Sequence, residues 1–184
     1  MKVNKKEYRF YAYKLHMVKE QEIRFLSDQA IHNSYSGSKL IKKVIRQIGQ
    51  TDRENFVVVM LNTKLIPIGT NLVSTGSLTR CIVQPREIIK AALNMPCKAL
   101  ILGHNHPSGD PSPSMEDKLI TLMIMASAHL FDVDILDHII VDMDSDAYLS
   151  FADEKIIEDT KRKVCSVLDQ ISRMQTKIGS KETS

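Results

Sequence analysis

Short apolar runs alternate with amphipathic stretches along this chain, which is the pattern of an α/β protein. The continuous apolar, β-branched run at 55–61 and the run at 99–103 predict strands covered on both faces. We expect further strands at 134–142 and 148–151, and a strand meander with a glycine-marked break at 65–84. The pattern therefore predicts a central sheet flanked by helices.

Apolar residues at helical spacing predict three helices between residues 34 and 130. The first has a polar turn at 34–38 before it and Gly49 after it, with one apolar face formed by Leu40, Ile41, Val44, Ile45 and Ile48. The second begins at Pro85, and its apolar face is Ile88, Ile89, Ala92 and Leu93. The third covers 115–130, and the residues expected to pack on the sheet are Leu119, Ile120, Leu122, Met123 and Ala126.

The two ends of the chain differ in character from this middle part. The alternating aromatic stretch 8–17 predicts a strand, with 22–25 as its partner, and 153–178 reads as a polar helix. We therefore divide the chain into an N-terminal extension at 1–50 (a strand plus an amphipathic helix), a domain at 51–152, and a C-terminal helix and tail at 153–184. An a/d stripe on the last helix either packs on its own domain or joins two chains in a homodimer; it comprises Ile157, Val164, Ile171 and Ile178, with Val167 and Met174.

Composition limits the classes of protein to consider. The 184 residues are 43% hydrophobic, enough for a buried core, and no apolar run approaches the ~20 residues of a spanning helix. We expect a cytoplasmic protein without membrane contact. Residues 1–50 carry eleven Lys and Arg against four Asp and Glu, although the whole chain has a net charge of only +3. This basic extension predicts either weak binding of nucleic acid or an acidic partner, or simply a solvated surface.

The stretch from Gly103 to Asp117, GHNHPSGDPSPSMED, has the composition of a metal site. Side chains alternate across an extended strand, so His104 and His106 can both reach one cation. After a proline-rich turn, Asp117 can supply a carboxylate from the first turn of the next helix. Two imidazoles, one carboxylate and an open position are typical of catalytic zinc, one ion per chain. Ser114 to Asp117 also fits a helix capping box, which needs no metal.

With this spacing the sequence resembles the JAMM metalloproteases of the JAB/MPN fold, and in particular the RadC-like proteins, whose motif reads HNHPSGDPxPSxxD. The resemblance covers 52–151 and includes PREIIKAAL at 85–93 and LDHIIV at 136–141. It implies a cytidine-deaminase-like architecture, a central mixed β-sheet flanked by helices. It also implies roles for five residues: His104, His106 and Asp117 as metal ligands, Ser114 as the hydroxyl beside the oxyanion, and Glu54 as the catalytic carboxylate before the first core strand.

Two of the candidate residues have alternative interpretations. Glu54 flanks a hydrophobic strand, where a charged residue is often a solvated gatekeeper. His138 lies inside an expected strand and could ligate the metal directly, but the resemblance already supplies three ligands. We therefore expect His138 to support a ligand or the structure.

Taken together, these features predict a zinc metallopeptidase that hydrolyses a peptide or isopeptide bond in a peptide or protein substrate that the sequence does not identify. The main alternative is a non-catalytic, metal-binding scaffold of the RadC-like family, associated with DNA repair or nucleic acid. A metal-dependent nuclease would leave the SxxD spacing unexplained. A zinc nucleoside deaminase needs HxE and PCxxC, and the sequence contains neither.

Overall fold

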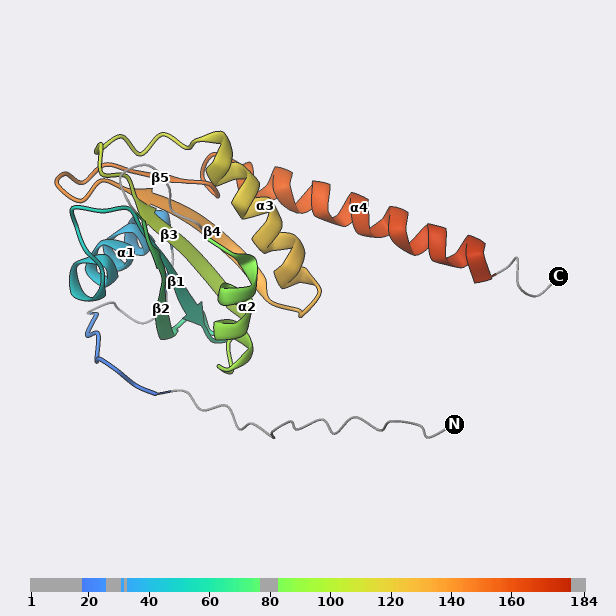
Figure 1. Ribbon diagram of the computed structural model, residues 1–184, viewed down its shortest axis with the longest axis horizontal. Helices are drawn as coiled ribbons and strands as arrows, with labels where there is room; N and C mark the ends of the chain where they lie inside the picture. Colours follow the sequence, from blue (N-terminus) through green and yellow to red (C-terminus); the bar gives the residue numbers. More distant parts are fainter. Residues whose placement is uncertain (1–17, 26–30, 32, 77–82, 180–184) are drawn as a thin grey trace, which may run out of the picture.

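The computed structural model describes residues 18–25, 31, 33–76 and 83–179. Four helices and five strands follow one another in the order α1 (Ser34–Ile48), β1 (Asn55–Leu61), β2 (Pro67–Thr75), α2 (Pro85–Leu93), β3 (Ala99–Asn105), α3 (Met115–His129), β4 (Asp134–Val141), β5 (Tyr148–Ser150) and α4 (Ile156–Gly179). The strands form one sheet with α1 on one face and α2 and α3 on the other (Figure 1). The α/β class predicted from the sequence is confirmed.

The sheet is mixed, with the strand order β2-β1-β3-β4-β5. β1 pairs antiparallel with β2 and β3, β3 pairs parallel with β4, and β4 pairs antiparallel with β5. All residues of β1 and β3 are buried, as expected for strands covered on both faces. Their register places Phe56 opposite His104, so the start of β1 lies beside the end of β3.

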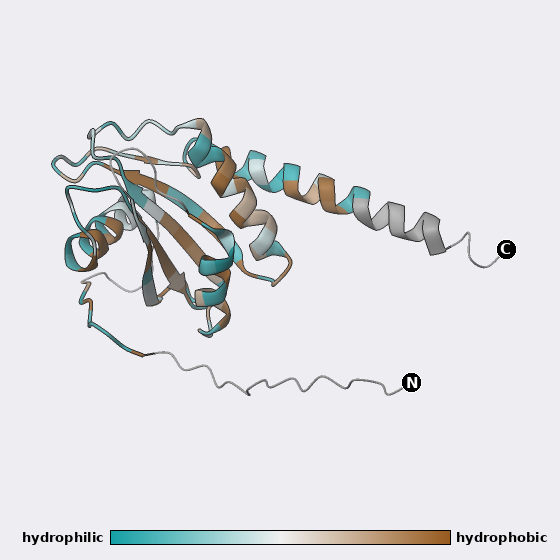
Figure 2. Cartoon of the chain, in the orientation of Figure 1, coloured by the Kyte–Doolittle hydropathy of each residue, from teal (hydrophilic) through white to brown (hydrophobic). Residues whose placement is uncertain are grey.

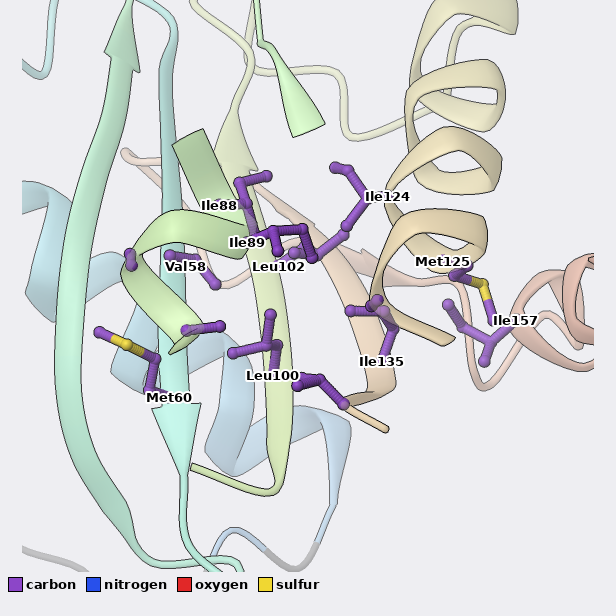
Figure 3. Close-up of a cluster of buried hydrophobic side chains, with 14 of the residues drawn as sticks. Val58, Met60, Ile88, Ile89, Leu100, Leu102, Ile124, Met125, Ile135 and Ile157 are labelled. Carbon is purple, nitrogen blue, oxygen red and sulfur yellow. The ribbon is translucent and has the colours of Figure 1, made fainter. Parts of the chain in front are cut away.

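Side-chain alternation along β1 divides the interior into two cores. Val58 and Met60 point to the face covered by α2 and α3, where Figure 3 shows them with Leu100 and Leu102 of β3, Ile88 and Ile89 of α2, and Ile124 of α3. Val57 and Val59 point to the opposite core, which α1 closes. Figure 2 shows the hydrophobic residues concentrated on the strands and on the sides of the helices that face them.

Several expectations at the N-terminal side need correction. Residues 34–38, expected to be a turn, form the first turn of α1, because the side chain of Asn33 caps the helix by accepting from the Ser36 backbone N–H at 2.8 Å. Residues 22–25 are not a strand; Ile23 and Phe25 instead pack against the core beneath α1. α1 packs into the same core as the strands, whereas the sequence pattern had separated it from the domain. The strand expected at 8–17 lies outside the described residues.

α3 is rotated relative to the expectation from its apolar pattern. Its buried face consists of Asp117, Thr121, Ile124, Met125 and Ala128, while Leu119 and Met123 are 55% and 48% exposed. Ile120, Leu122 and Ala126 are only partly buried at the sides. Most of α3 is apolar, so hydrophobicity alone does not select one side. The two buried polar residues, Asp117 and Thr121, decide which side of the helix faces the sheet.

The C-terminal helix α4 begins against α3 and then extends away from the sheet (Figure 1). Ile157, Thr160 and Val164 are buried, and Val167 is 54% exposed. The first part of the expected a/d stripe therefore packs on its own domain. The side chains from Ile171 onward lie outside the described residues, so the homodimer stays a prediction. None of the helices of the described residues is long and apolar enough to cross a lipid bilayer.

The closeness of α1 to the sheet depends on glycine. A Cβ on Gly103, in the middle of β3, would lie 2.5 Å from Cδ1 of Ile41, closer than real carbon contacts allow. A Cβ on Gly37 would likewise lie 2.6 Å from Cδ1 of Ile139 in β4. The two glycines let the helix backbone approach the strands directly.

We predict that Gly103→Ala lowers the free energy of unfolding by about 1–3 kcal/mol, the usual cost of inserting a methyl group into a packed core. Chemical denaturation measures the change. Gln47→Ala on the exposed side of α1 is the control and should change stability by less than about 0.5 kcal/mol. Equal stability of Gly103→Ala and the wild type would show that α1 can shift outward at no cost.

Candidate metal centre

The two histidines of the HNH sequence lie where β3 ends. His104 is the penultimate residue of β3, its side chain is fully buried, and its ring stacks on Phe56 with ring centroids 5.8 Å apart. His106 follows the strand and is partly exposed, at the start of the turn that leads to α3. The strand therefore presents both imidazoles on one side, as the alternation rule predicts.

The carboxylate comes from the first turn of α3. Ser114 caps this helix: its hydroxyl accepts from the Asp117 backbone N–H at 3.0 Å, and Asp117 Oδ2 accepts from the Ser114 backbone N–H at 2.8 Å. Ser114 Oγ also donates to Asp117 Oδ2 at 2.6 Å. The capping box, which the sequence offered as an alternative to a metal ligand, includes the candidate ligand Asp117 itself, so the two interpretations are compatible. The cap holds Oδ2 and so orients the Asp117 side chain.

Donor atoms of three side chains converge at one point. His104 Nε2 lies 3.0 Å from His106 Nε2 and 3.2 Å from Asp117 Oδ1, and His106 Nε2 lies 3.6 Å from Asp117 Oδ2. One ligand atom from each of His104, His106 and Asp117 lies within 4.8 Å of the others. The cluster could hold a metal ion, and it leaves room in the coordination sphere for a ligand that is not protein.

The hydrogen bond on the far side of the His106 ring defines its tautomer. His106 Nδ1 lies 2.7 Å from the Asp110 backbone oxygen, which can only accept a proton. Nδ1 must therefore carry the hydrogen, and in the neutral ring Nε2 presents a lone pair to the cluster. A backbone carbonyl behind a metal-binding imidazole is a common arrangement in proteins.

A chain of hydrogen bonds gives His104 the same tautomer. Thr121 Oγ1 donates to the Asp117 backbone oxygen at 2.6 Å, so it must accept from His138 Nδ1, 2.7 Å away. His138 is fully buried, and burial lowers the pKa of its imidazole well below the usual value. The ring is therefore neutral, and its Nε2 carries a lone pair that can accept a hydrogen bond. That nitrogen accepts from His104 Nδ1 at 2.8 Å. His104 Nε2 is thereby left free of hydrogen and faces the cluster.

The electrostatics of the cluster favour positive charge. Burial alone would raise the pKa of the Asp117 carboxyl, but the neighbouring imidazoles of His104 and His106, which favour the charged carboxylate when they carry positive charge, and the Ser114 hydroxyl hold that pKa well below its usual range. The Asp117 carboxylate, which would accept a hydrogen bond from the protonated Nε2 of the charged ring, raises the pKa of His106. Two imidazole lone pairs 3.0 Å apart repel each other unless a proton or a metal cation lies between them and the carboxylate. The chemistry of the donor set therefore fits a divalent cation.

Glu54 immediately precedes β1 and is half-buried. Burial raises the pKa of its carboxyl, while positive charge on His104 and His106 lowers it and the charge of Asp117 raises it. The side chain therefore lies within the electric field of the cluster. Its carboxyl makes no side-chain hydrogen bond to another part of the described chain.

The sequence patterns did not indicate two residues that complete the surroundings of the cluster. Thr121 stands four residues after Asp117, on the same face of α3, and this spacing is the signal that could have revealed it. The backbone oxygen of Asp110 leaves no trace in a residue pattern. His138 comes from β4, and only the parallel pairing of β3 with β4 brings it against His104.

Comparison with known proteins agrees with this geometry. The family model for the RadC-like JAB domain matches residues 34–156, a range that starts at α1 and ends at the start of α4. By fold and site, the molecule is thus a JAB-type α/β domain with a His-His-Asp cluster. The chain belongs to the RadC-like JAB domain family.

Curated relatives share this part of the chain. A UPF0758 protein of Moorella thermoacetica is 40% identical over 116 residues, which are 63% of this chain and 49% of that protein. One from Clostridium botulinum strain Eklund 17B is 51% identical over 89 residues, 48% of this chain and 39% of the relative. One from Methanosarcina mazei is 42% identical over 106 residues, 58% and 45% of the two chains. This chain spans about half the length of the relatives it matches.

We predict that the purified protein binds about one divalent metal ion per chain and that His106→Ala binds very little, because one of three ligand atoms is lost. Metal analysis by inductively coupled plasma mass spectrometry measures the content. The control is His129→Ala, which removes an exposed imidazole at the end of α3. Equal metal content in His106→Ala and the wild type would contradict the assignment of the cluster.

Proposed function

We propose that this chain is a zinc-dependent hydrolase of the JAMM type that cleaves a peptide or isopeptide bond. The observation that carries the proposal is the convergence of two unprotonated Nε2 atoms and Asp117 Oδ1. The half-buried carboxyl of Glu54 is electrostatically coupled to all three residues. A purely structural zinc site would normally be closed by four protein ligands. Three ligands with an ionisable group nearby are typical of hydrolytic metal sites.

His104, His106 and Asp117 would hold the zinc ion. When bound, zinc supplies a Lewis acid and lowers the pKa of a coordinated water toward ~7. Nitrogen and carboxylate donors suit this ion, whereas all-oxygen sites suit magnesium or calcium. The described residues offer no cysteine to the cluster, because Cys97 and Cys165 lie elsewhere in the fold.

Glu54 would act as the proton carrier. In amide hydrolysis the attacking water must lose a proton and the leaving amine must gain one, so a single carboxylate can serve both steps. Burial raises the pKa of Glu54, which makes the carboxylate a better base near neutral pH. Because Glu54 is not one of the three clustered ligand residues, its loss should affect catalysis and leave metal binding intact.

Ser114 would stabilise the oxyanion. Its single hydroxyl proton is donated to Asp117 Oδ2, so a hydrogen bond to a substrate oxygen requires the hydroxyl to rotate away from that partner. The Asp117 carboxylate keeps the backbone N–H of Ser114 as a partner during this exchange. A donor aimed at a developing oxyanion typically contributes ~10²–10³-fold to kcat.

His138 and Thr121 would keep His104 in the metal-binding tautomer. The proton on His104 Nδ1 is held by His138 Nε2, and the proton on His138 Nδ1 is held by Thr121 Oγ1. Phe56 and Phe151 enclose both rings in an apolar setting, with centroids of Phe151 and His138 4.7 Å apart. In this setting each ring nitrogen needs a partner, so the whole chain of hydrogen bonds adopts one arrangement.

The competing function is a metal-binding scaffold without catalysis. Both functions predict a bound metal, and they differ in whether Glu54 matters. Partners, including nucleic acid at the basic N-terminal extension and a second copy at α4, are separate proposals that neither function requires.

We predict that the wild type contains about one zinc per chain and that Glu54→Gln retains it but loses ~10²–10⁴ in kcat, the usual contribution of a general acid/base group. The assay uses unstructured synthetic peptides and peptides branched through a lysine side-chain amide, with cleavage detected by mass spectrometry.

Glu116→Gln is the matched control for that substitution, since Glu116 lies exposed in the first turn of α3 beside Asp117 and should tolerate it. Loss of zinc in Glu54→Gln would make Glu54 a ligand. A zinc-loaded wild type that cleaves none of these peptides would favour the scaffold.

We also predict that Thr121→Val weakens zinc binding ~10–100-fold, the usual cost of losing a residue that orients a ligand. Valine has the same shape but cannot hold the His138 proton, so the tautomers of His138 and His104 are no longer defined. Competition with a chelator measures the affinity. Thr70→Val in β2 removes a hydroxyl that donates to the Val58 backbone oxygen of β1, and it should leave zinc affinity unchanged. Wild-type affinity in Thr121→Val would show that His104 needs no such support.

A further inference from the structure

Glu54 stands outside the regular structure, although a proton carrier must be held accurately. It lies between a turn at 51–53 and the first residue of β1. Productive geometry typically requires placement within ~0.5 Å. The backbone oxygen of Glu54 accepts from the Gly76 N–H at 2.9 Å, which holds the peptide group after Glu54 by its oxygen only. This contact does not reach the peptide group before Glu54.

One amide side chain contacts both of those peptide groups. Asn105 Nδ2 donates to the Arg53 backbone oxygen at 2.8 Å, and Asn105 Oδ1 accepts from the Asn55 backbone N–H at 3.0 Å. The Arg53 carbonyl belongs to the peptide bond before Glu54, and the Asn55 N–H belongs to the one after it. Fixing both peptide planes restricts both backbone dihedrals of Glu54, and therefore the direction in which its side chain leaves the chain.

Asn105 can hold these groups because it is rigid and buried. It is the last residue of β3, lies between His104 and His106, and is completely buried. Since side chains alternate along a strand, β3 directs two imidazoles to the cluster and the intervening amide toward the Glu54 backbone. The end of β3 therefore holds the backbone of Glu54 in a fixed position relative to the candidate ligands His104 and His106.

A second amide connects this arrangement to α1. Asn55 Nδ2 donates to Arg53 O at 2.8 Å and to Gln50 O at 2.7 Å, and Asn55 Oδ1 accepts from the Gln50 N–H at 2.9 Å. Gly49, which ends α1, permits the close approach, since a Cβ there would lie 2.8 Å from Asn55 Oδ1. The segment that carries Glu54 is thereby fixed to α1 on one side and to β3 on the other.

We propose that Asn105 is the positioning residue for Glu54, acting through the two peptide groups that flank it. The inference rests on the proposed function, because it assigns Asn105 to the same reaction. An amide is required at this position: aspartate offers no donor to Arg53 O, and alanine offers neither a donor nor an acceptor. A merely structural asparagine would support stability without affecting what Glu54 does.

The first test measures hydrogen exchange at the Asn55 amide in the zinc-loaded protein. Asn105→Ala should speed exchange at this amide about tenfold or more, because its hydrogen-bond acceptor is lost and the segment opens locally. Zinc content should stay at about one per chain. Asn62→Ala is the matched control: Asn62 Oδ1 accepts from the Lys64 and Ile66 N–H groups in the β1–β2 turn, away from the cluster.

The second test measures hydrolysis of the peptides described above. Asn105→Ala should lower kcat by ~10²-fold, the usual effect of a small misplacement of a reacting group, with KM unchanged. In the Glu54→Gln background the same substitution should change kcat little, because residues that act as a unit are not additive. A purely structural role would lower kcat by the same factor in both backgrounds. Asn62→Ala should match the wild type.

Asn105→Asp keeps the acceptor for the Asn55 N–H, so Asn55 exchange should lie closer to the wild type than in Asn105→Ala. This variant also serves if Asn105→Ala fails to fold. A substrate-free readout is the pKa of the Glu54 carboxyl, followed by carbon NMR. In metal-free Asn105→Ala it should move toward the value of an exposed glutamate, because burial raises the pKa of this group in the wild type.

The outcomes separate the two proposals. Unchanged Asn55 exchange and an unchanged Glu54 pKa in Asn105→Ala would overturn the positioning role, whether or not a substrate is found. A wild type that cleaves no peptide would overturn the proposed hydrolase, and the exchange and pKa measurements would still decide whether Asn105 places Glu54. Loss of kcat in Asn105→Ala together with loss of zinc would also overturn the positioning role, since the effect would then pass through the ligands.

Discussion

The two imidazole rings at the end of β3 face each other through their Nε2 atoms at 3.0 Å, and both have their Nδ1 proton engaged on the far side. Each ring therefore presents a lone pair to the same point, which is unfavourable without a positive charge there. Much of the surrounding structure serves this requirement. The parallel pairing of β3 with β4 supplies His138, the turn before α3 supplies the Asp110 carbonyl, and α3 supplies the opposing carboxylate.

α3 is where this requirement competes with hydrophobic burial. Asp117 and Thr121 face the sheet, and Leu119 and Met123 are left about half exposed as a consequence. Fully burying a large apolar side chain contributes about 1.5–3 kcal/mol, and these two half-exposed residues gain only part of it. The inward direction of the polar pair is therefore maintained at the expense of stability. Ile124, Met125 and Ala128 on the same face as Asp117 still close the core behind it. The helix thus shares one face between a polar cluster at its start and an apolar core further along.

The sheet itself supports the cluster by being packed closely on both faces. Gly103 immediately precedes His104 and admits α1 to direct contact with β3, while Phe56 stacks on the other side of the same strand end. Because β3 is closely packed on both faces, its backbone cannot move easily, and the side chains at its end keep fixed positions. The alternation of His104, Asn105 and His106 then uses both sides of that end, with the imidazoles directed to the cluster and the amide directed to the backbone around Glu54.

Much of this protein follows from local sequence. The apolar runs of β1 and β3, the start of α2 at Pro85 and the cap at Ser114 are set by neighbouring residues, so their positions could be predicted. The same holds for the grouping of His104, His106 and Asp117, because a strand, a short turn and a capped first helical turn leave little freedom between them. Only the tertiary structure decided which side of α3 faces inward, that Thr121 and His138 support His104, and that Asn105 contacts both peptide groups around Glu54. These contacts join residues far apart in the chain, and whether they form depends on strand pairing and helix packing, which no local pattern of residues specifies.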